Sequence, residues 1–210
     1  MPASDTDSDL IIVGLGNPGD DYAHTRHNVG WDAIDELARR LGADVSRKRW
    51  HSRIGSVTVD GRRVWLVEPQ TFMNMSGRAV KEAARDVDVG PEAVWVVHDE
   101  VDLPPGRIRI KVGGSAAGHN GIRSIIGSLG GDGFTRFRIG VGKPPRRGSE
   151  AGVRHVLGRF RGREKELMDA VVAGVADALE MALHEGVERA MTRYNRNGSV
   201  GPATVEEGTA

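Results

Sequence analysis

Short apolar runs alternate along this chain with longer segments whose apolar residues recur at helical spacing, and this alternation constrains the fold most. Residues 10–13 and 94–97 are apolar runs typical of buried strands, whereas 29–41 and 164–183 carry apolar side chains every three or four positions. An Asp-Gly turn at 60–61 predicts a hairpin between two further strands. In full, the pattern predicts strands at 10–13, 54–59, 63–67, 94–97, 107–112 and 137–141, and helices at 29–41, 76–87, 119–129, 164–183 and 187–194.

Strands interspersed with helices, together with one hairpin, predict an α/β fold: a single-domain α/β/α sandwich with a twisted mixed β-sheet. The length of 210 residues suits one domain or at most two small ones. Residues 1–8 and 197–210 are polar and show no strand or helix pattern. We therefore expect a flexible tail at each end and one folded domain over 9–196.

Composition excludes several classes of protein. The chain has no cysteine, which rules out a disulfide scaffold, a thiol nucleophile, an iron–sulfur cluster and a zinc site built on Cys. Its 29 basic and 29 acidic residues balance, so it is no polycation, although a local basic face is compatible with that balance. The start is rich in Asp and lacks positive charge, unlike a secretory signal, and no run approaches the roughly 20 apolar residues of a membrane span. We expect a cytoplasmic protein without membrane contact.

The first strand is followed at 14–19 by the glycine-rich loop Gly-Leu-Gly-Asn-Pro-Gly. It matches the G-x-G-x-x-G string of dinucleotide-binding proteins, but in those a helix begins within the motif, and here the helical pattern begins only near Val29. Two other interpretations fit the loop better than a dinucleotide site. The loop is a plain turn, or it presents the Asn17 amide at the carboxyl edge of the sheet.

Two histidines precede the first predicted helix. His24 and His27 are three residues apart and could share a metal with Asp99, Glu100 or His119. No diagnostic zinc spacing such as H-E-x-x-H accompanies them. A surface or capping role is the ordinary alternative for each.

A third loop, 69–77, places Asn74 between Met73 and Met75. Core packing, with Ser76 as the N-cap of the next helix, would explain most of this segment. It does not explain Asn74, because a buried amide needs hydrogen-bond partners, which the peptide groups of a substrate could supply.

Two further loops carry candidate groups. Asp99 and Glu100 follow a buried strand, where catalytic groups of α/β proteins tend to lie, although a solvated acidic turn is the alternative. The loop at 113–121 is rich in glycine and opens a helix, so its backbone amides could bind a phosphate or carbonyl oxygen. It lacks a Walker lysine and is therefore no P-loop, and a flexible connection is the alternative.

Taken together, these loops bring three asparagines, two histidines and an aspartate to loop ends. Neither a G-x-S-x-G elbow nor a cysteine is present as a nucleophile. The set favours activation of water, in which a His takes the proton, an Asp orients the imidazole, and amides hold a carbonyl compound.

These motifs resemble those of bacterial peptidyl-tRNA hydrolase. The resemblance rests on Gly-Leu-Gly-Asn-Pro-Gly at 14–19, Tyr-x-x-Thr-Arg-His-Asn at 22–28, Thr-Phe-Met-Asn-x-Ser-Gly at 71–77, His-Asp-Glu-x-Asp-Leu-Pro-x-Gly at 98–106 and Gly-His-Asn-Gly at 118–121. Shorter matches extend it over about 9–196, in order and at family-like spacing. The resemblance implies a monomer that cleaves the ester between a peptide, or an N-blocked amino acid, and the ribose of its tRNA, without metal or cofactor.

The resemblance also implies roles for single residues. His27 matches the catalytic base and Asp99 the acid that orients or polarises it. The implied substrate site comprises three amides that hold the peptide, a tyrosine, a methionine and the histidine of a lid-like mobile loop: Asn17, Asn74, Asn120, Tyr22, Met73 and His119. An ester is attacked more easily than an amide, so one activated water suffices without a covalent intermediate.

Positive charge gathers late in the chain, with ten Lys or Arg against two acidic residues from Arg136 to Lys165. A solvated surface is the ordinary explanation for such a run, but a local excess in a neutral chain also suits the phosphates of tRNA. By resemblance, Arg109, Lys111 and Arg138 contact the phosphate end of the tRNA.

One residue departs from the family pattern. Ala117 stands where the family often has glycine, and alanine disfavours positive φ, so we expect the loop to move less or to rest in another shape.

Three interpretations compete with the hydrolase. The main rival is a non-catalytic RNA-binding relative, against which the intact set of His27, Asp99 and asparagines argues. The second is a nucleotide-cofactor enzyme built on the first glycine-rich loop. The third is a metal-dependent hydrolase using His24, His27, Asp99 and His119.

Overall fold

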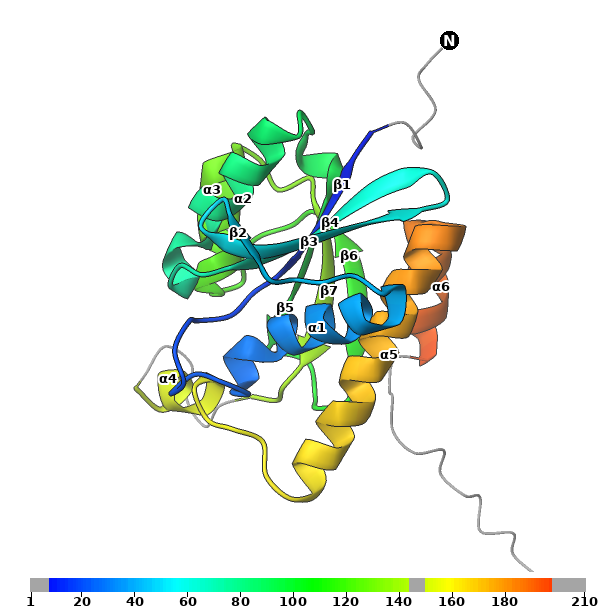
Figure 1. Ribbon diagram of the computed structural model, residues 1–210. Helices are drawn as coiled ribbons and strands as arrows, with labels where there is room; N and C mark the ends of the chain where they lie inside the picture. The colour runs from blue at the N-terminus through cyan, green and yellow to red at the C-terminus, as the bar shows by residue number, and fades with distance from the viewer. Residues whose placement is uncertain (1–7, 144–149, 198–210) are drawn as a thin grey trace, which may run out of the picture.

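A computed structural model describes residues 8–143 and 150–197. Within these residues a seven-stranded sheet runs in the order β2-β3-β4-β1-β5-β7-β6 (Figure 1). The strands are β1 (Leu10–Gly14), β2 (Arg47–Arg49), β3 (Ser52–Val59), β4 (Arg62–Pro69), β5 (Val94–Glu100), β6 (Ile108–Val112) and β7 (Thr135–Gly140). Neighbours among β4, β1, β5 and β7 pair in parallel, whereas β2–β3, β3–β4 and β6–β7 are antiparallel. The sheet is mixed, as predicted.

Helices cover both faces of the sheet (Figure 1). One layer contains α1 (Val29–Leu41), α5 (Arg163–Glu185) and α6 (Val187–Asn197), and the other contains α2 (Ser76–Asp86) and α3 (Asn120–Leu129). The short helix α4 (Glu150–Val156) lies beside the 3₁₀ turn η1 (Arg26–Asn28), and two further 3₁₀ turns are η2 (Met73–Met75) and η3 (Pro91–Ala93). These three layers confirm the predicted α/β/α sandwich.

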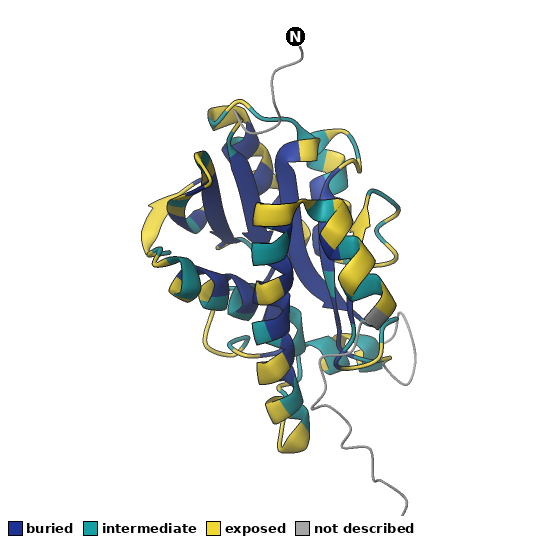
Figure 2. Cartoon of the chain, turned by 90° about the vertical axis from the view of Figure 1, so that its right-hand side faces the viewer, coloured by how far each residue is buried: buried dark blue, intermediate teal, exposed yellow. Residues whose placement is uncertain are grey.

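The central strands are apolar on both faces because helices bury both faces. Alternate residues of β1 enter different cores: Leu10 and Ile12 pack toward α1 and α5, and Ile11 and Val13 pack toward α2 and α3. Figure 2 shows the buried strands enclosed by helices whose outer surfaces are exposed. The continuous apolar runs of the sequence therefore mark the centre of the sheet.

β1 and β5 are neighbours in the sheet, and the strands that follow them along the chain lie toward opposite edges: β2, β3 and β4 beyond β1, and β6 and β7 beyond β5. Such a switch point forms a crevice at the edge of a parallel sheet. Gly30 lets α1 begin directly against it, because a Cβ there would lie 2.5 Å from the carbonyl oxygen of Val97 and 2.6 Å from the backbone of Leu15. This close approach brings His27, three residues before Gly30, to the end of β5.

Every predicted strand and helix is present, with ends shifted by a few residues. Besides the three 3₁₀ turns, one strand and one α-helix were not predicted: β2, whose three residues are all exposed, and α4, which buries no residue. Ser76 is not the N-cap expected: it is the first residue of α2, and its hydroxyl donates to the carbonyl of Met73 at 2.9 Å. Apart from Ser8 and Asn197, the predicted tails lie outside the described residues, as does 144–149 of the basic stretch.

Candidate active site

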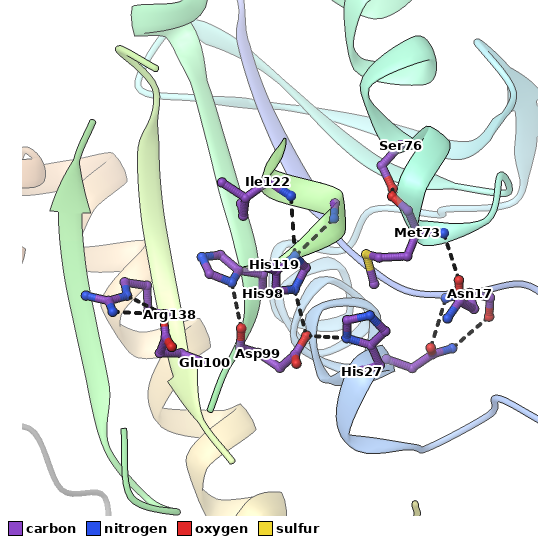
Figure 3. A network of polar contacts seen from close by, with 12 residues as sticks. Asn17, His27, Met73, Ser76, His98, Asp99, Glu100, His119, Ile122 and Arg138 are labelled. Atoms are coloured by element: carbon purple, nitrogen blue, oxygen red, sulfur yellow. Dashed lines mark hydrogen bonds and ion pairs between the residues drawn. The ribbon is translucent and has the colours of Figure 1, made fainter. Parts of the chain in front are cut away.

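Three side chains from separate parts of the chain meet near the carboxyl end of β5 (Figure 3). Asp99 lies near the end of β5, His27 in η1, and His119 directly before α3. Nδ1 of His27 lies 2.8 Å and Nε2 of His119 lies 2.9 Å from the same oxygen, Oδ1 of Asp99. The predicted catalytic pair is thus brought together, and His119 joins it.

The surrounding hydrogen bonds determine which ring nitrogen carries each proton. Nδ1 of His119 accepts from the backbone N–H groups of Gly121 at 3.1 Å and Ile122 at 3.3 Å, so its proton resides on Nε2 and is donated to Asp99. His27 donates to the carboxylate through Nδ1. In neutral His27, Nε2 therefore carries no proton and keeps its lone pair. A general base needs such a nitrogen to accept a proton.

The charges in this group stabilise one another. Burial alone would raise the pKa of Asp99, but His27 and His119 hold it well below the ordinary value. Burial acts to lower the pKa of His27, and the charge and hydrogen bond of Asp99 outweigh it, so that this pKa lies above the ordinary value. Asp99 is consequently ionised and accepts hydrogen bonds from both rings.

A further histidine, His98, lies behind this group on β5. It is buried and its Nδ1 donates to the carbonyl of Asp99 at 2.7 Å, while its ring packs edge-on against His119 at 4.8 Å between centroids. Burial, and then His119, hold its pKa well below the ordinary value, so His98 is neutral. It supports the end of β5 and the ring of His119.

Asn17 is fixed by two neighbouring segments (Figure 3). Its side-chain oxygen accepts from the backbone N–H of Met73 at 2.8 Å. Asn28 holds its main chain from the other side, accepting from the N–H of Asn17 and donating to its carbonyl, both at 2.9 Å. Asn28 was not singled out from the sequence, although its place directly after His27 was a usable signal.

The other predicted substrate residues differ in exposure. Met73 is buried, but Asn74 and Asn120 are exposed, so the prediction of a buried Asn74 amide was wrong. The side-chain oxygen of Asn120 accepts from Arg123 at 2.8 Å. Exposed amides on η2 and at the start of α3 can reach a ligand, which the predicted role requires.

An aromatic pair lies beside these amides. The half-buried ring of Tyr22 meets Phe72 edge-on, with centroids 6.5 Å apart. Phe72 is 57% exposed, an unusual degree for so large an apolar side chain. The core packing that the sequence suggested for this loop therefore does not hold for Phe72.

Basic residues form a two-by-two grid on the antiparallel pair β6–β7. Arg109 stands opposite Arg138, and Lys111 stands opposite Arg136. Arg109 and Lys111 are exposed, whereas Arg138 forms an ion pair with Glu100 at 2.8 Å. The three residues predicted to contact phosphates therefore lie on one strand pair. The sequence did not reveal that Glu100 pairs with Arg138 or that Arg136 stands opposite Lys111.

The hypothesis of a metal site loses one of its four ligands. The His24 side chain is 81% exposed and pairs with Asp32 at 3.2 Å, away from the central group. Ligand atoms of His27, Asp99 and His119 do lie within 4.8 Å of one another and could hold an ion. In this arrangement, however, both ring nitrogens that face Asp99 carry hydrogen and donate it, which suits a hydrogen-bonded group.

The hypothesis of a dinucleotide site does not fit the first loop. No helix begins within 14–19, since α1 begins only at Val29. A Cβ on Gly16 would lie 2.7 Å from the indole of Trp31, so that glycine serves packing against α1. In the later glycine-rich loop, Ala117 adopts the left-handed conformation with φ of 47°, which alanine disfavours.

Comparison with known proteins places the chain among its relatives. The profile of the family described as Peptidyl-tRNA hydrolase matches residues 11–201. Peptidyl-tRNA hydrolases of Caldanaerobacter subterraneus subsp. tengcongensis and Chloroflexus aggregans are 48% and 45% identical to it, each over 88% of this chain and 98% of the relative. The crystal structure of peptidyl-tRNA hydrolase from Acinetobacter baumannii superposes with a TM-score of 0.86 at 36% identity, covering 95% of this chain and 100% of that one.

None of the helices in the described part of the chain is long and apolar enough to cross a membrane. The match to the family profile spans most of the chain, and the relatives agree with it in sequence and in fold. This chain belongs to the peptidyl-tRNA hydrolase family.

Proposed function

We propose that this protein hydrolyses the ester bond between a peptide, or an N-blocked amino acid, and tRNA, and so recycles tRNA from peptidyl-tRNA released by ribosomes. The observation that carries this function is the 2.8 Å hydrogen bond from Nδ1 of His27 to Asp99, which leaves Nε2 free to accept a proton. A non-catalytic RNA-binding protein would have no use for a buried, ionised Asp99 beneath a polarised imidazole.

In the proposed reaction, Nε2 of His27 takes a proton from a water molecule as that water attacks the ester carbonyl carbon. The tetrahedral intermediate then expels the ribose oxygen, which receives the proton back from His27. Asp99 stays ionised throughout and stabilises the imidazolium that forms between these steps. The water divides between the products, its hydroxyl on the acid and its second hydrogen on the ribose, and no covalent enzyme intermediate is required.

Amide side chains hold the peptide in this proposal. Asn17, Asn74 and Asn120 can donate to carbonyls and accept from N–H groups of a peptide backbone without recognising its side chains. The side-chain oxygen of Asn17 already accepts from Met73, so its NH₂ group is the part offered to the substrate. Tyr22, together with Phe72, supplies an apolar wall for the residue next to the ester.

The tRNA part of the substrate binds to the two-by-two grid of basic residues on β6–β7. Arg109 and Lys111 are exposed and are proposed to contact phosphates directly, which sets affinity and its dependence on salt rather than sequence preference. Arg138 is held by Glu100 and joins them as a cation whose position is already set. His119 completes the site as the second donor to Asp99.

The proposed catalytic unit is residues 9–196, which act as a cytoplasmic monomer without a metal or cofactor. One chain supplies every side chain invoked in the reaction, which supports a monomer. Histidine, aspartate and asparagine supply all the proton transfer that ester hydrolysis needs, which supports a reaction without a cofactor.

The test is release of N-acetyl-amino acid from N-acetyl-aminoacyl-tRNA in the presence of EDTA, with wild type and His27→Ala. We expect rapid release by wild type and a loss of about 10²–10⁴-fold in kcat in the variant, with binding of the tRNA retained. Release that EDTA abolishes would instead support the metal-dependent hydrolase. Binding of the tRNA by wild type with the ester left intact would support the RNA-binding relative.

A further inference from the structure

Arg136 is an arginine buried within the sheet rather than at its surface. It lies on β7, is 4% exposed, and its guanidinium lies 4.6 Å from the centroid of the Phe134 ring. Nη1 donates to the carbonyl of Ser115 at 2.7 Å and Nη2 to the carbonyl of Gly114. Both acceptors belong to one loop, 113–119, which runs from β6 to α3.

The first residues of this loop, Gly113 and Gly114, are fixed by hydrogen bonds, and its last residue, His119, contacts Asp99. The N–H of Gly114 donates to the Asp132 side chain at 2.8 Å, and the N–H of Gly113 donates to the carbonyl of Phe134 at 3.1 Å. At the far end, His119 caps α3 through Nδ1 and donates through Nε2 to Asp99. The contacts of Arg136 thus lie four and five residues before the histidine that faces Asp99.

Burial disfavours the charge of Arg136 and so lowers its pKa, an effect that the nearby Asp132 carboxylate offsets only in part. Arg136 stands directly opposite Lys111 in β6–β7, and like charges facing each other across strands are destabilising. Burying a guanidinium also has a cost unless it makes good hydrogen bonds. Its strongest contacts are charge-assisted hydrogen bonds to two loop carbonyls, so holding that loop is the role its geometry serves.

We propose that Arg136 is a positioning residue: it sets the conformation of the 113–119 loop and thereby keeps His119 on Asp99. The inference rests on the proposed function, in which His27 and Asp99 form the reacting pair. It extends that function because one side chain, Arg136, would connect β6–β7, the strand pair proposed to contact the tRNA phosphates, to the group formed by His27, Asp99 and His119.

The linkage has a consequence for the pH dependence of the reaction. The titratable and charged groups around Asp99 are His27, His119, His98 behind them, and the Arg138–Glu100 pair on the adjoining strands. A loop released from Arg136 lets His119 leave the carboxylate, which then faces His27 alone. The pKa of His27 rises, because an unshared negative charge stabilises the imidazolium more.

The experiment compares Arg136→Lys and Arg136→Gln with Lys111→Met and with Arg63→Lys, an exposed arginine on β4. For the Arg136 variants we expect kcat to fall about ten- to a hundredfold, and the acid limb of the kcat/KM profile to move to higher pH. We also expect faster hydrogen exchange at the amides of 113–119 and an unchanged slope of log(kcat/KM) against log[salt]. Lys111→Met should raise KM and reduce that slope, and Arg63→Lys should behave as wild type.

Two results with the Arg136 variants would overturn the proposal. An Arg136→Lys variant that raises KM and lowers the salt slope, with the loop amides and the acid limb unmoved, makes Arg136 a phosphate contact instead. A variant that only melts earlier, with kcat and pH profile intact below its melting temperature, reduces Arg136 to a structural residue.

A second variant guards against failure to fold. Asp132→Ala removes the other hold on Gly114 at an exposed side chain, and a smaller effect of the same sign is expected. If it speeds exchange in the loop and leaves the acid limb unmoved, the proposed link from loop to Asp99 is wrong. Hydrogen exchange at the amides of 113–119 also distinguishes this proposal from the proposed function. It reports the stability of the loop even if the protein hydrolyses no ester.

Discussion

Oδ1 of Asp99 lies 2.8 Å from Nδ1 of His27, and the same oxygen accepts a second hydrogen bond from His119 at 2.9 Å. One carboxylate oxygen therefore orients the proposed base and anchors the loop beside it. Because the Asp99 side chain is only 2% exposed, little solvent screens these interactions. The rate and its pH dependence should both respond to this single carboxylate.

The first prediction concerns the acid limb of the activity profile. His27 must be neutral to accept a proton, and Asp99 holds its pKa above the ordinary value of 6.5 despite burial, which acts in the opposite direction. We expect kcat/KM of the wild type to rise with pH through a midpoint above 6.5. Asp99→Asn removes the negative charge, so the midpoint should move to lower pH while kcat falls about 10⁴-fold, as when an orienting aspartate is lost. A midpoint that stays in place would mean that another group sets it.

The second prediction concerns stability and has a definite pH window. The pKa of Asp99 is depressed in the fold, so its contribution is present above about 3.8 and is lost as pH falls through the lower folded value. The pKa of His27 is raised, so its contribution is complete below about 6.5 and is lost as pH rises through the higher folded value. Urea unfolding of wild type and Asp99→Asn should therefore differ most between about pH 4 and 6.5, on the order of 3 kcal/mol, and less on either side. A difference that is constant from about pH 3 to 9 would contradict the ion pair.

The centre of the sheet was predictable because β1 and β5 are rich in continuous apolar residues, and α1 because its apolar residues share one face. Two elements were not, for a physical reason: β2 is three exposed basic residues and α4 buries none, so neither leaves a hydrophobic pattern. These elements are short and depend on their neighbours. Residue propensities and hydrophobic periodicity describe a segment by itself, so they cannot predict elements that form only through contacts with their neighbours.

The candidate site divides in the same way. Residue types and family motifs identified His27, Asp99 and His119, but not that both histidines donate to one oxygen. That arrangement joins residues 72 and 20 positions apart, and it depends on strand order and on the way His119 caps α3. Asn74 shows the opposite failure, since its position between two methionines suggested burial, while the short η2 turn exposes it.

The third prediction separates the cations on β6–β7. Arg109→Gln and Lys111→Met should each lower the salt slope of log(kcat/KM) by about 1, because each removes one proposed phosphate contact, and should leave Tm unchanged. Arg138→Gln should lower Tm as well, since it leaves the nearly buried Glu100 carboxylate without its partner. Activity assays from low to moderate salt, with thermal melts, test both parts. Equal melting of all three variants would show that the Glu100 pair contributes nothing measurable.

The fourth prediction tests the close approach of α1 to the sheet. A Cβ at Gly30 would lie 2.5 to 2.6 Å from backbone atoms of Val97 and Leu15, which cannot move aside as side chains can. Gly30→Ala should destabilise the protein by about 1–3 kcal/mol and reduce kcat, because α1 must shift and take His27 from Asp99. Gly127→Ala is the matched control: that glycine lies in α3 with open space around its Cβ, so about 0.5–1 kcal/mol should be gained. Equal effects of the two changes would mean that the crossing of α1 tolerates a side chain.

The last prediction concerns Ala117, whose φ of 47° lies in the left-handed region that costs an L-residue roughly 1 kcal/mol or more. Ala117→Gly removes that cost, but glycine also raises the conformational entropy of the unfolded chain, which offsets part of the gain. We therefore expect the free energy of unfolding to rise by about 0.5 kcal/mol. Ala170→Gly, at an exposed helical position of α5, should change stability in the opposite direction by about 0.5–1 kcal/mol. Urea denaturation of both variants decides the matter. If both variants lose stability alike, Ala117 does not adopt the left-handed conformation in solution. The two hydrogen bonds from Arg136 to the loop would then restrain its conformation less than their geometry implies.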